Sequence, residues 1–438
     1  MKNWKTGTGG ETTAKALAGA LAMLILALES ASAATTATPQ RHADPFERGA
    51  TRLRDQPAPE RLPSETNNPV LAPLVGVWNR FPPDLRHYPT IRSNHTFNIA
   101  IHIVRPAPGK PVLVCIHGIL ADYLMWEYIT AALAGDYELW LVDLPGCGDS
   151  DAPKPSAIEP DGYSPTAMGD RVWQALRQRL AAEGGAPPRH ITLVGHSLGG
   201  TVVIRMLSAP ELQVRYAAEQ RRIDRTVLFA PCDQAINAVP PSFLTLLGLK
   251  GWMVTVGDVL GVFDAKVRDL TRRNFQVPEF ATIERQERFA HALGHSEHRE
   301  AAKAILRQFT PFDPKTLRPI WPEIDRLVAD YRNIRIPVLI VHGAWDETLT
   351  SDMGHALKDH IPGAMLVEVP GRSHSLPTED PMKCSALIQR FQQGLESEGL
   401  VAGLDADFFP ATAILRPNPL LSGSAAAGLK SAAPPPSL

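Results

Sequence analysis

The chain has 438 residues, 44% of them hydrophobic and 21% charged, which is an ordinary globular composition with enough length for a sizeable core. A formal net charge of −2 excludes a strongly basic nucleic-acid-binding protein, and four cysteines are too few for a disulfide scaffold. The 40 prolines indicate long irregular segments.

Residues 1–33 have the pattern of a secretory signal peptide. A lysine-containing stretch precedes an apolar run over 16–28, and Ala31-Ser32-Ala33 supplies the small residues of a cleavage site. The run is shorter than the roughly 20 residues that a membrane-spanning helix needs. We therefore expect the mature chain to begin at Ala34 and to be exported, periplasmic or secreted, without a stable membrane span. An uncleaved anchor or an ordinary amphipathic helix are the alternatives.

Two other segments lack the apolar periodicity of helices and strands. Residues 34–84 are rich in Pro, Thr, Arg and Ala, which predicts a linker or an N-terminal arm lying on the surface. Residues 399–438 end in Ser, Ala, Gly and Pro, which predicts a disordered low-complexity tail. Within that tail, Phe408, Phe409, Ile414 and Leu415 are apolar enough to dock on the folded part.

Between these segments, short apolar runs typical of buried strands alternate with helical patterns. This alternation predicts an α/β fold with a mostly parallel sheet covered by helices on both faces, in two parts, 85–232 and 336–398. We expect strands at 95–104, 112–116, 138–142, 191–194, 226–230, 337–341 and 365–369, and helices at 126–134, 167–183 and 199–207.

Residues 233–335 separate the two parts and are too long for a loop within a compact domain. Their pattern predicts a helical cap over the carboxyl end of the sheet. We expect its helices at 242–262, 266–273, 283–293, 299–309 and 323–333. The apolar residues of the cap either pack together or line a pocket for an apolar substrate, and the pattern does not separate these two possibilities.

The most specific motif is Gly195-His196-Ser197-Leu198-Gly199, which lies between a predicted strand and a predicted helix. In that setting the G-x-S-x-G pattern forms a sharp turn that exposes the serine hydroxyl, and the glycines are required because a side chain would clash there. We therefore predict that Ser197 is a nucleophile and that Gly195, His196 and Gly199 support its turn.

With this motif in place, residues 85–395 resemble the α/β-hydrolase family, most closely its capped, lipase-like serine esterase branch. The resemblance implies the α/β-hydrolase fold, with the cap inserted between the sixth and seventh strands. It also implies a Ser…Asp…His order, met here by Asp346 and His374, which each follow a predicted strand. Epoxide hydrolases and dehalogenases share the similar cap but use a carboxylate nucleophile, so Ser197 argues against their chemistry.

The roles of the predicted triad follow from the chemistry of serine. A hydroxyl is a weak nucleophile and needs a base, so His374 is expected to take the Ser197 proton while Asp346 orients the imidazole. The developing oxyanion needs two backbone N–H donors. We assign these to Leu198, which follows the nucleophile, and to Ile119 in His117-Gly118-Ile119-Leu120, with Leu120 as the less favoured choice.

Other residues near these motifs are alternatives. Asp233 follows the strand at 226–230 and could replace Asp346 as the acid. Glu347 is expected to face solvent, His342 and His196 are assigned structural roles, and His117 is expected to support the oxyanion loop.

Two further groups have binding chemistry in principle. His291, His295 and His298 have a helical spacing that could hold a metal, although a solvated face is favoured and no metal site is predicted. Cys147 and Cys232 could pair in an exported protein, but pairing cannot be deduced from sequence.

Together these observations predict an exported serine hydrolase that cleaves carboxylic esters of apolar acyl groups through an acyl-enzyme, with no cofactor. The expected partner is a small apolar ester, with no nucleic acid, and the oligomeric state is open. The main alternative is a serine hydrolase of another bond, namely a C–C hydrolase, a thioesterase or a perhydrolase. A non-catalytic binding protein on the same fold is the second alternative.

Overall fold

The computed structural model describes residues 64–69, 71–104, 109–155, 161–183, 190–235, 275, 280–292, 296–313, 315–316, 318–395, 398–401 and 414–415. The predicted signal peptide, most of the predicted arm and tail, and the expected helices at 242–262 and 266–273 lie outside these ranges. No helix in the described ranges is both long and apolar enough to cross a membrane.

A single sheet runs through the middle of the molecule in the order β1-β2-β4-β3-β5-β6-β7-β8-β9. The six strands from β4 to β8 in this order are parallel, whereas β1, β2 and β9 add antiparallel edges. The strands are β1 (Asp84–Arg92), β2 (His95–Val104), β3 (Val112–Ile116), β4 (Glu138–Val142), β5 (Ile191–His196), β6 (Ile223–Phe229), β7 (Val338–Gly343), β8 (Met365–Val369) and β9 (Ile414–Leu415). This confirms the predicted α/β-hydrolase fold with a mostly parallel sheet.

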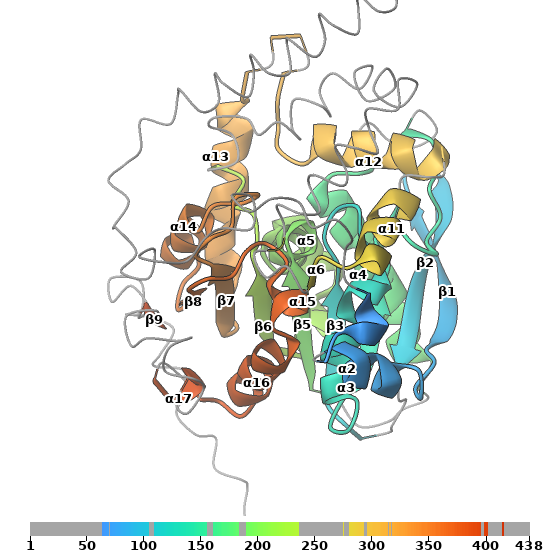
Figure 1. Ribbon diagram of the computed structural model, residues 1–438. Helices are drawn as coiled ribbons and strands as arrows, with labels where there is room; N and C mark the ends of the chain where they lie inside the picture. The colour runs from blue at the N-terminus through green and yellow to red at the C-terminus, as the bar shows by residue number, and fades with distance from the viewer. Residues whose placement is uncertain are drawn as a thin grey trace, which may run out of the picture.

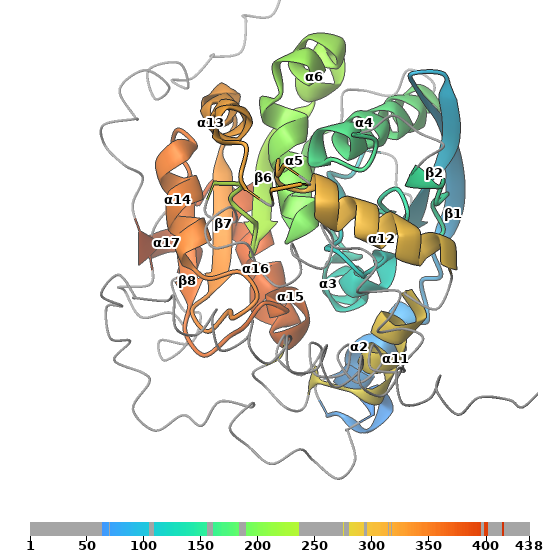
Figure 2. The ribbon, with the colours of Figure 1, turned by 90° about the horizontal axis from the view of Figure 1, so that it is seen from above.

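Helices cover both faces of this sheet (Figures 1 and 2). One face carries α4 (Pro165–Ala181), α5 (Leu198–Ser208) and α14 (Asp352–His360), and the other carries α3 (Glu127–Leu133) and α16 (Pro381–Gln392). The remaining short helices of the two core parts are η2 (Glu65–Asn67), α2 (Leu71–Trp78), η3 (Tyr123–Trp126), α6 (Pro210–Arg215), α7 (Ala217–Gln220), α15 (Leu376–Glu379) and α17 (Glu398–Val401).

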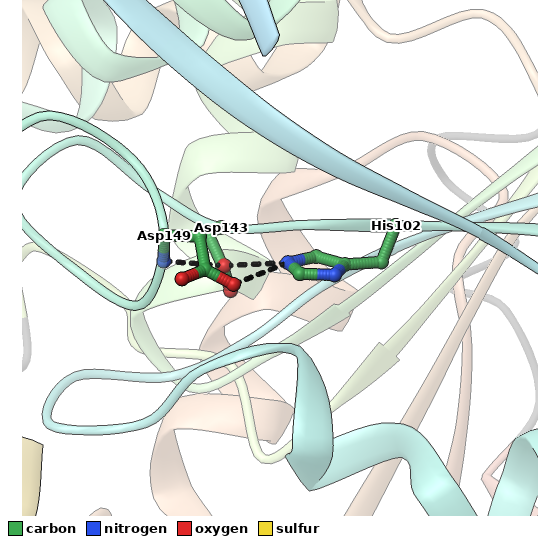
Figure 3. A group of neighbouring side chains, drawn as sticks. All are labelled: His102, Asp143 and Asp149. Atoms are coloured by element: carbon green, nitrogen blue, oxygen red, sulfur yellow. Dashed lines mark hydrogen bonds and ion pairs between the residues drawn. The ribbon is translucent and has the colours of Figure 1, made fainter. Parts of the chain in front are cut away.

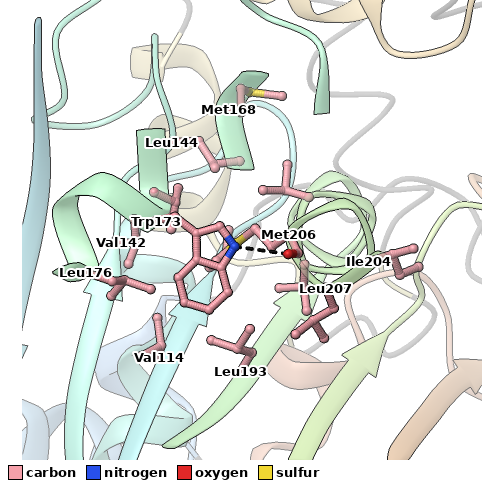
Figure 4. Packing of buried hydrophobic residues seen from close by; sticks show 14 of the residues in the cluster. Val114, Val142, Leu144, Met168, Trp173, Leu176, Leu193, Ile204, Met206 and Leu207 are labelled. Atoms are coloured by element: carbon pink, nitrogen blue, oxygen red, sulfur yellow. Dashed lines mark hydrogen bonds between the residues drawn. The ribbon is translucent and has the colours of Figure 1, made fainter. Parts of the chain in front are cut away.

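The strand sequences explain this layering. Successive side chains of a strand point to opposite faces, so a strand buried on both sides is apolar throughout. In β3, Val114 packs into the cluster under α4 and α5, while its neighbours Leu113 and Cys115 pack into the cluster under α3 and α16. Figure 4 shows the first cluster, where the Trp173 indole N–H also donates to the carbonyl oxygen of Met206 at 3.0 Å.

The described residues between β6 and β7, where the sequence predicts the cap, form three α-helices. They are α11 (Ile283–Ala292), α12 (Ser296–Gln308) and α13 (Trp321–Asp330), the last followed by η7 (Tyr331–Asn333). In Figures 1 and 2, α12 lies across the carboxyl ends of the strands, whereas α11 lies to one side, next to α2. Their positions agree with the helices expected at 283–293, 299–309 and 323–333.

The ends of the core differ from the sequence-based expectation. Helix α2 and strand β1 lie at least partly within the predicted arm at 34–84, and Leu71 is fully buried against Tyr128 and Phe275. In the predicted tail at 399–438, Leu400 is fully buried, which differs from the predicted disorder. Ile414–Leu415 pairs with β8, which confirms the expectation that these two residues dock on the folded part, whereas Phe408 and Phe409 lie outside the described residues. Both segments are therefore partly packed, because scattered apolar residues find partners that are distant in sequence.

A buried ion cluster joins the N-terminal segment to the core and to the cap. The carboxylates are Glu65 and Glu127, and the guanidinium groups are Arg285 and Arg288 of α11. Arg285 Nε lies 3.2 Å from Glu65 Oε1 and Arg285 also pairs with Glu127. Arg288 Nη1 lies 2.6 Å from Glu127 Oε1. Because α3 supplies Glu127, this cluster fixes α11 and the Glu65 segment on the same core helix.

We expect Arg285→Met to lower the free energy of unfolding by about 3–5 kcal/mol, because it leaves two buried carboxylates short of positive charge. Arg86→Met is the matched control, since Arg86 forms an exposed ion pair with Asp84 and should cost at most about 1 kcal/mol. Urea unfolding of both variants measures the difference. Equal losses would show that the ion cluster does not hold the cap to the core.

Candidate active site

Ser197 occupies a strained turn between β5 and α5. Its backbone has φ 51° and ψ −120°, a region that a residue with a side chain rarely adopts. The Ser197 N–H donates to the carbonyl oxygen of Phe229 in β6 at 3.0 Å, which ties the turn to the neighbouring strand. The neighbouring strand therefore stabilises the strained conformation, as the sharp turn predicted at Ser197 requires.

The two motif glycines permit this turn by their missing side chains. A Cβ on Gly199 would lie 2.2 Å from the carbonyl oxygen of Ile116 and 2.4 Å from that of His117. A Cβ on Gly195 would lie 2.7 Å from the carbonyl oxygen of Gly199. These obstacles are backbone atoms that cannot move aside, so helix α5 reaches the sheet edge only with glycine at both positions.

Asp346 and His374 come together from the loops after β7 and β8. His374 Nδ1 lies 2.7 Å from Asp346 Oδ2, and both residues are buried. The other carboxylate oxygen, Asp346 Oδ1, accepts the backbone N–H groups of Thr348 and Leu349 at 2.8 Å each. The carboxylate is therefore held in one orientation, facing the imidazole.

The charge on Asp346 is stabilised by two histidines. Burial raises the pKa of the Asp346 carboxyl, but the charge of His374 and the hydrogen bonds from His342 and His374 outweigh burial, so its pKa lies well below the ordinary value. His342 Nε2 lies 3.4 Å from Asp346 Oδ2 and 2.8 Å from the carbonyl oxygen of Leu349. Asp346 is therefore an anion that can balance an imidazolium at His374.

The alternative acid, Asp233, lies in a different environment. Its Oδ1 accepts the backbone N–H of Ala235 at 2.9 Å, and its Oδ2 lies 3.5 Å from His360 Nδ1. Of the two carboxylates, Asp346 is the one hydrogen-bonded to His374. The geometry thus favours Asp346 as the partner of the histidine.

His196 joins the serine turn to the histidine loop. Its Nε2 lies 2.8 Å from the carbonyl oxygen of His374, and the two rings have centroids 4.8 Å apart. Burial, followed by the charge of His374, lowers the pKa of His196 to about 3, so its ring is neutral at neutral pH and donates from Nε2. No hydrogen bond joins Ser197 Oγ to His374 within the described ranges. Such bonds often tighten only when substrate is bound.

The predicted oxyanion segment lies beside the nucleophile. A Cβ on Gly118 would be 3.2 Å from Ser197 Cβ. Leu120, two residues after Gly118, has a positive φ of 57°. His117 supports this segment, because its Nε2 accepts the Leu144 N–H at 3.0 Å while its Nδ1 donates to the Gly118 carbonyl oxygen at 2.7 Å. These bonds define the tautomer of His117 and connect the oxyanion segment to the loop after β4.

The Leu198 N–H lies at the first position of α5, where backbone donors have no partner within the helix. Ile119 lies one residue beyond Gly118 in the segment beside Ser197. Both predicted oxyanion donors therefore belong to backbone that surrounds the Ser197 turn.

One group in the described ranges has the composition of a cation site, namely His102, Asp143 and Asp149 (Figure 3). The oxygens of Asp143 already accept the N–H groups of Tyr123 at 2.8 Å and of Asp149 at 2.9 Å, and His102 Nε2 lies 2.9 Å away. Because its oxygens already accept these donors, we read Asp143 as a hydrogen-bonding centre that shapes the loop after β4.

The structure also describes part of the histidine group and all of the cysteines. His298 lies on α12 and lines a small pocket, whereas His295 lies outside the described ranges. All four cysteines are buried free thiols, so the conceivable Cys147–Cys232 pairing is not formed. The sequence assigns supporting roles to His196 and His342, but it does not predict their contacts with His374 and Asp346, because these contacts depend on how separate loops meet.

We expect Gly199→Ala to lower the free energy of unfolding by about 3 kcal/mol or more, because its Cβ meets two carbonyl oxygens. Gly76→Ala in α2 is the control. Nothing lies within 4 Å of its Cβ, so it should stabilise the fold by about 0.5–1 kcal/mol. Chemical unfolding of both variants tests this, and equal stability would contradict the close approach of α5 to the sheet.

The comparisons with known proteins agree with this geometry. Residues 113–387 match the model of the alpha/beta hydrolase family. The pimeloyl-[acyl-carrier protein] methyl ester esterase of Nitrosomonas europaea is 26% identical over 281 residues, covering 63% of this chain and 93% of that protein.

Two solved structures share the fold. An esterase from Rhodococcus sp. ECU1013 superposes with a TM-score of 0.50 at 22% identity, covering 71% of this chain and 99% of that one. A bromoperoxidase from Bacillus anthracis superposes with a TM-score of 0.52 at 19% identity, covering 71% and 100%. With the family model matched across most of the core, the chain belongs to the alpha/beta hydrolase family.

Proposed function

We propose that this protein is a serine carboxylesterase, lipase-like in its cap, that hydrolyses small apolar esters through a Ser197–His374–Asp346 triad. The observation that supports this most directly is the buried hydrogen bond between Asp346 and His374, whose loop is joined to the strained Ser197 turn through His196. The match to a relative named as a methyl ester esterase favours a carboxylic ester over other bonds.

The proposed reaction has two halves. His374 Nε2 takes the proton of Ser197 as its Oγ attacks the ester carbonyl carbon, and the N–H groups of Ile119 and Leu198 stabilise the oxyanion. The intermediate collapses, the C–O bond to the alcohol breaks, and His374 returns the proton to the departing alcohol oxygen. Water then attacks the acyl-enzyme by the same route and releases the acid and free Ser197.

The surrounding residues supply the electrostatics of this cycle. His374 becomes a cation when it holds the proton, and the anionic Asp346 stabilises that cation. His342 and the Thr348 and Leu349 N–H groups keep Asp346 ionised and oriented. The proposed chemistry uses protein groups alone and needs no cofactor.

Ester turnover by a set of matched variants tests this assignment. With p-nitrophenyl acetate and butyrate, we expect Ser197→Ala to abolish turnover and Asp346→Asn to lower kcat by roughly 10⁴-fold, because the imidazolium loses its counterion. Asp233→Asn removes an equally buried carboxylate and should leave kcat within a few-fold. Turnover that survives Ser197→Ala, or a larger loss from Asp233→Asn than from Asp346→Asn, would contradict the proposed triad.

We also propose that the protein is exported and that residues 1–33 are removed. The lysine-containing start, the short apolar run and Ala31-Ser32-Ala33 carry this proposal. In a host with a secretory pathway, N-terminal sequencing of the exported fraction should read from Ala34, and replacing Ala33 with a bulky charged residue should block processing. A chain that stays in the cytosol with its original N-terminus would contradict export.

A further inference from the structure

The imidazole of His196 contacts two parts of the proposed active site that come from different loops. His196 ends β5, directly before Ser197, and is buried. On one side its Nε2 lies 2.8 Å from the carbonyl oxygen of His374. On the other side it faces the predicted oxyanion segment, since a Cβ on Gly118 would lie 2.8 Å from Nδ1 and 3.4 Å from Cε1. One side chain therefore touches the base loop and the oxyanion segment together.

The two ring nitrogens of His196 have different surroundings. Burial, followed by the charge of His374, lowers the pKa of His196 to about 3, so the ring is neutral and carries one proton. Nε2 holds that proton, because the carbonyl oxygen beside it can only accept. Nδ1 is therefore an acceptor, and it is buried with no hydrogen-bond partner among the described residues. The hydrogen that Gly118 carries in place of a side chain faces it.

The contact at Nδ1 limits how closely the oxyanion segment can approach the Ser197 turn. The ring cannot move aside without breaking its hydrogen bond to the His374 carbonyl oxygen. Ile119, the proposed oxyanion donor, directly follows Gly118, so its N–H moves with the backbone that rests on the ring. An oxyanion donor is effective only within about 2.7–3.1 Å of the oxygen, so this placement decides how well the donor works.

We propose that His196 is a positioning residue that sets the separation between the oxyanion segment and the His374 loop. Its Nδ1 edge places Gly118, and its Nε2–H places His374. The inference goes beyond the proposed triad and rests on the proposed function, because both placed groups act in that reaction. A nitrogen buried against carbon costs free energy that an apolar ring would avoid, so the Nε2 hydrogen bond is what distinguishes histidine from phenylalanine here.

Three substitutions separate the two contacts. His196→Gln places an amide N–H where Nε2 lies, so it keeps the bond to His374 but leaves the ring edge at Gly118 empty. His196→Asn reaches only as far as Nδ1, and His196→Phe supplies a ring without a donor. Both of these keep a contact at Gly118 and lose the bond to His374, so either one suffices if the other does not fold. His190→Asn is the matched control, since His190 is an exposed histidine paired with Asp224.

Two measurements report on the two contacts separately. The first is the ratio of kcat/KM for p-nitrophenyl acetate to kcat/KM for its thionoester, in which sulfur replaces the carbonyl oxygen. Sulfur accepts hydrogen bonds weakly, so this ratio measures the contribution of the oxyanion donors. The second is the low-field proton NMR signal of the hydrogen between His374 and Asp346, which is recorded in the free protein and needs no turnover.

We expect His196→Gln to lower the ester-to-thionoester ratio by about tenfold and to keep the low-field signal, because only the oxyanion segment is displaced. His196→Asn and His196→Phe should keep the ratio of wild type but lose or broaden the signal. They should also lower kcat by roughly 100-fold with little change in KM, because the base is misplaced. His190→Asn should match wild type in both measurements.

The outcomes distinguish this inference from the proposed function. If wild type turns over esters and either measurement fails to separate His196→Gln from the other two variants, the inference is wrong. If wild type hydrolyses no ester, the proposed function fails and the NMR signal alone decides the inference. A signal kept in His196→Gln and lost in His196→Asn and His196→Phe would then support it, and any other pattern would overturn it.

Discussion

The backbone at Ser197 is the constraint on which the rest of the site depends. A positive φ at a residue with a side chain costs on the order of 1–3 kcal/mol and persists only where the surroundings enforce it. Here the sheet enforces it through the hydrogen bond from Ser197 to Phe229, and the absent side chains of Gly195 and Gly199 let α5 approach the sheet. The turn places the hydroxyl at the carboxyl edge and leaves the Leu198 N–H at the start of a helix.

Hydrogen bonds connect this turn to two loops that are far away in sequence. His196, next to Ser197, donates to the backbone of His374, so the serine turn and the histidine loop are held together by a neutral ring. The loop that carries Asp346 is joined to His374 by the hydrogen bond between the two side chains. Asp346 itself accepts two backbone N–H groups and contacts His342. The acid, the base and the turn are thus positioned by residues that need not touch the substrate.

Among the described residues, several contacts connect the cap to the core, and two of them involve α11 and α12 directly. The ion cluster of Glu65, Glu127, Arg285 and Arg288 holds α11 to α3, and the contact of Gly146 with Ala301 holds α12 against the loop after β4. These contacts hold the described helices α11 and α12 against the core.

Local sequence predicted the core strands well for a physical reason. Strands buried on both faces consist mainly of apolar residues, so 112–116, 138–142 and 365–369 were predicted with the bounds that the structure has. The strand at 95–104 was predicted with its bounds from alternating Phe, Ile and Val. Strand β1 was missed because it lies at an edge and is largely polar and exposed. The packing of Leu71 with Phe275 and the pairing of Glu65 with Arg285 were missed because each joins residues more than two hundred positions apart, which no local pattern records.

The candidate site likewise combines residues that the sequence predicts with contacts that only the structure shows. Ser197 was identified by a five-residue motif, and Asp346 and His374 by their places after two late strands. The choice between Asp346 and Asp233 needed the three-dimensional structure, because both carboxylates follow strands and both are buried. The contacts of His196 and His342 likewise arise only where separate loops meet.

Direct detection of the covalent intermediate tests the central claim. Wild-type protein is mixed with p-nitrophenyl acetate, quenched in acid within the first turnovers and analysed by peptide mass spectrometry. The account predicts an acetyl group on Ser197, formed at least as fast as the product appears, and none in Ser197→Ala. Ester turnover with an unmodified Ser197, or with the acetyl group on another residue, would contradict it.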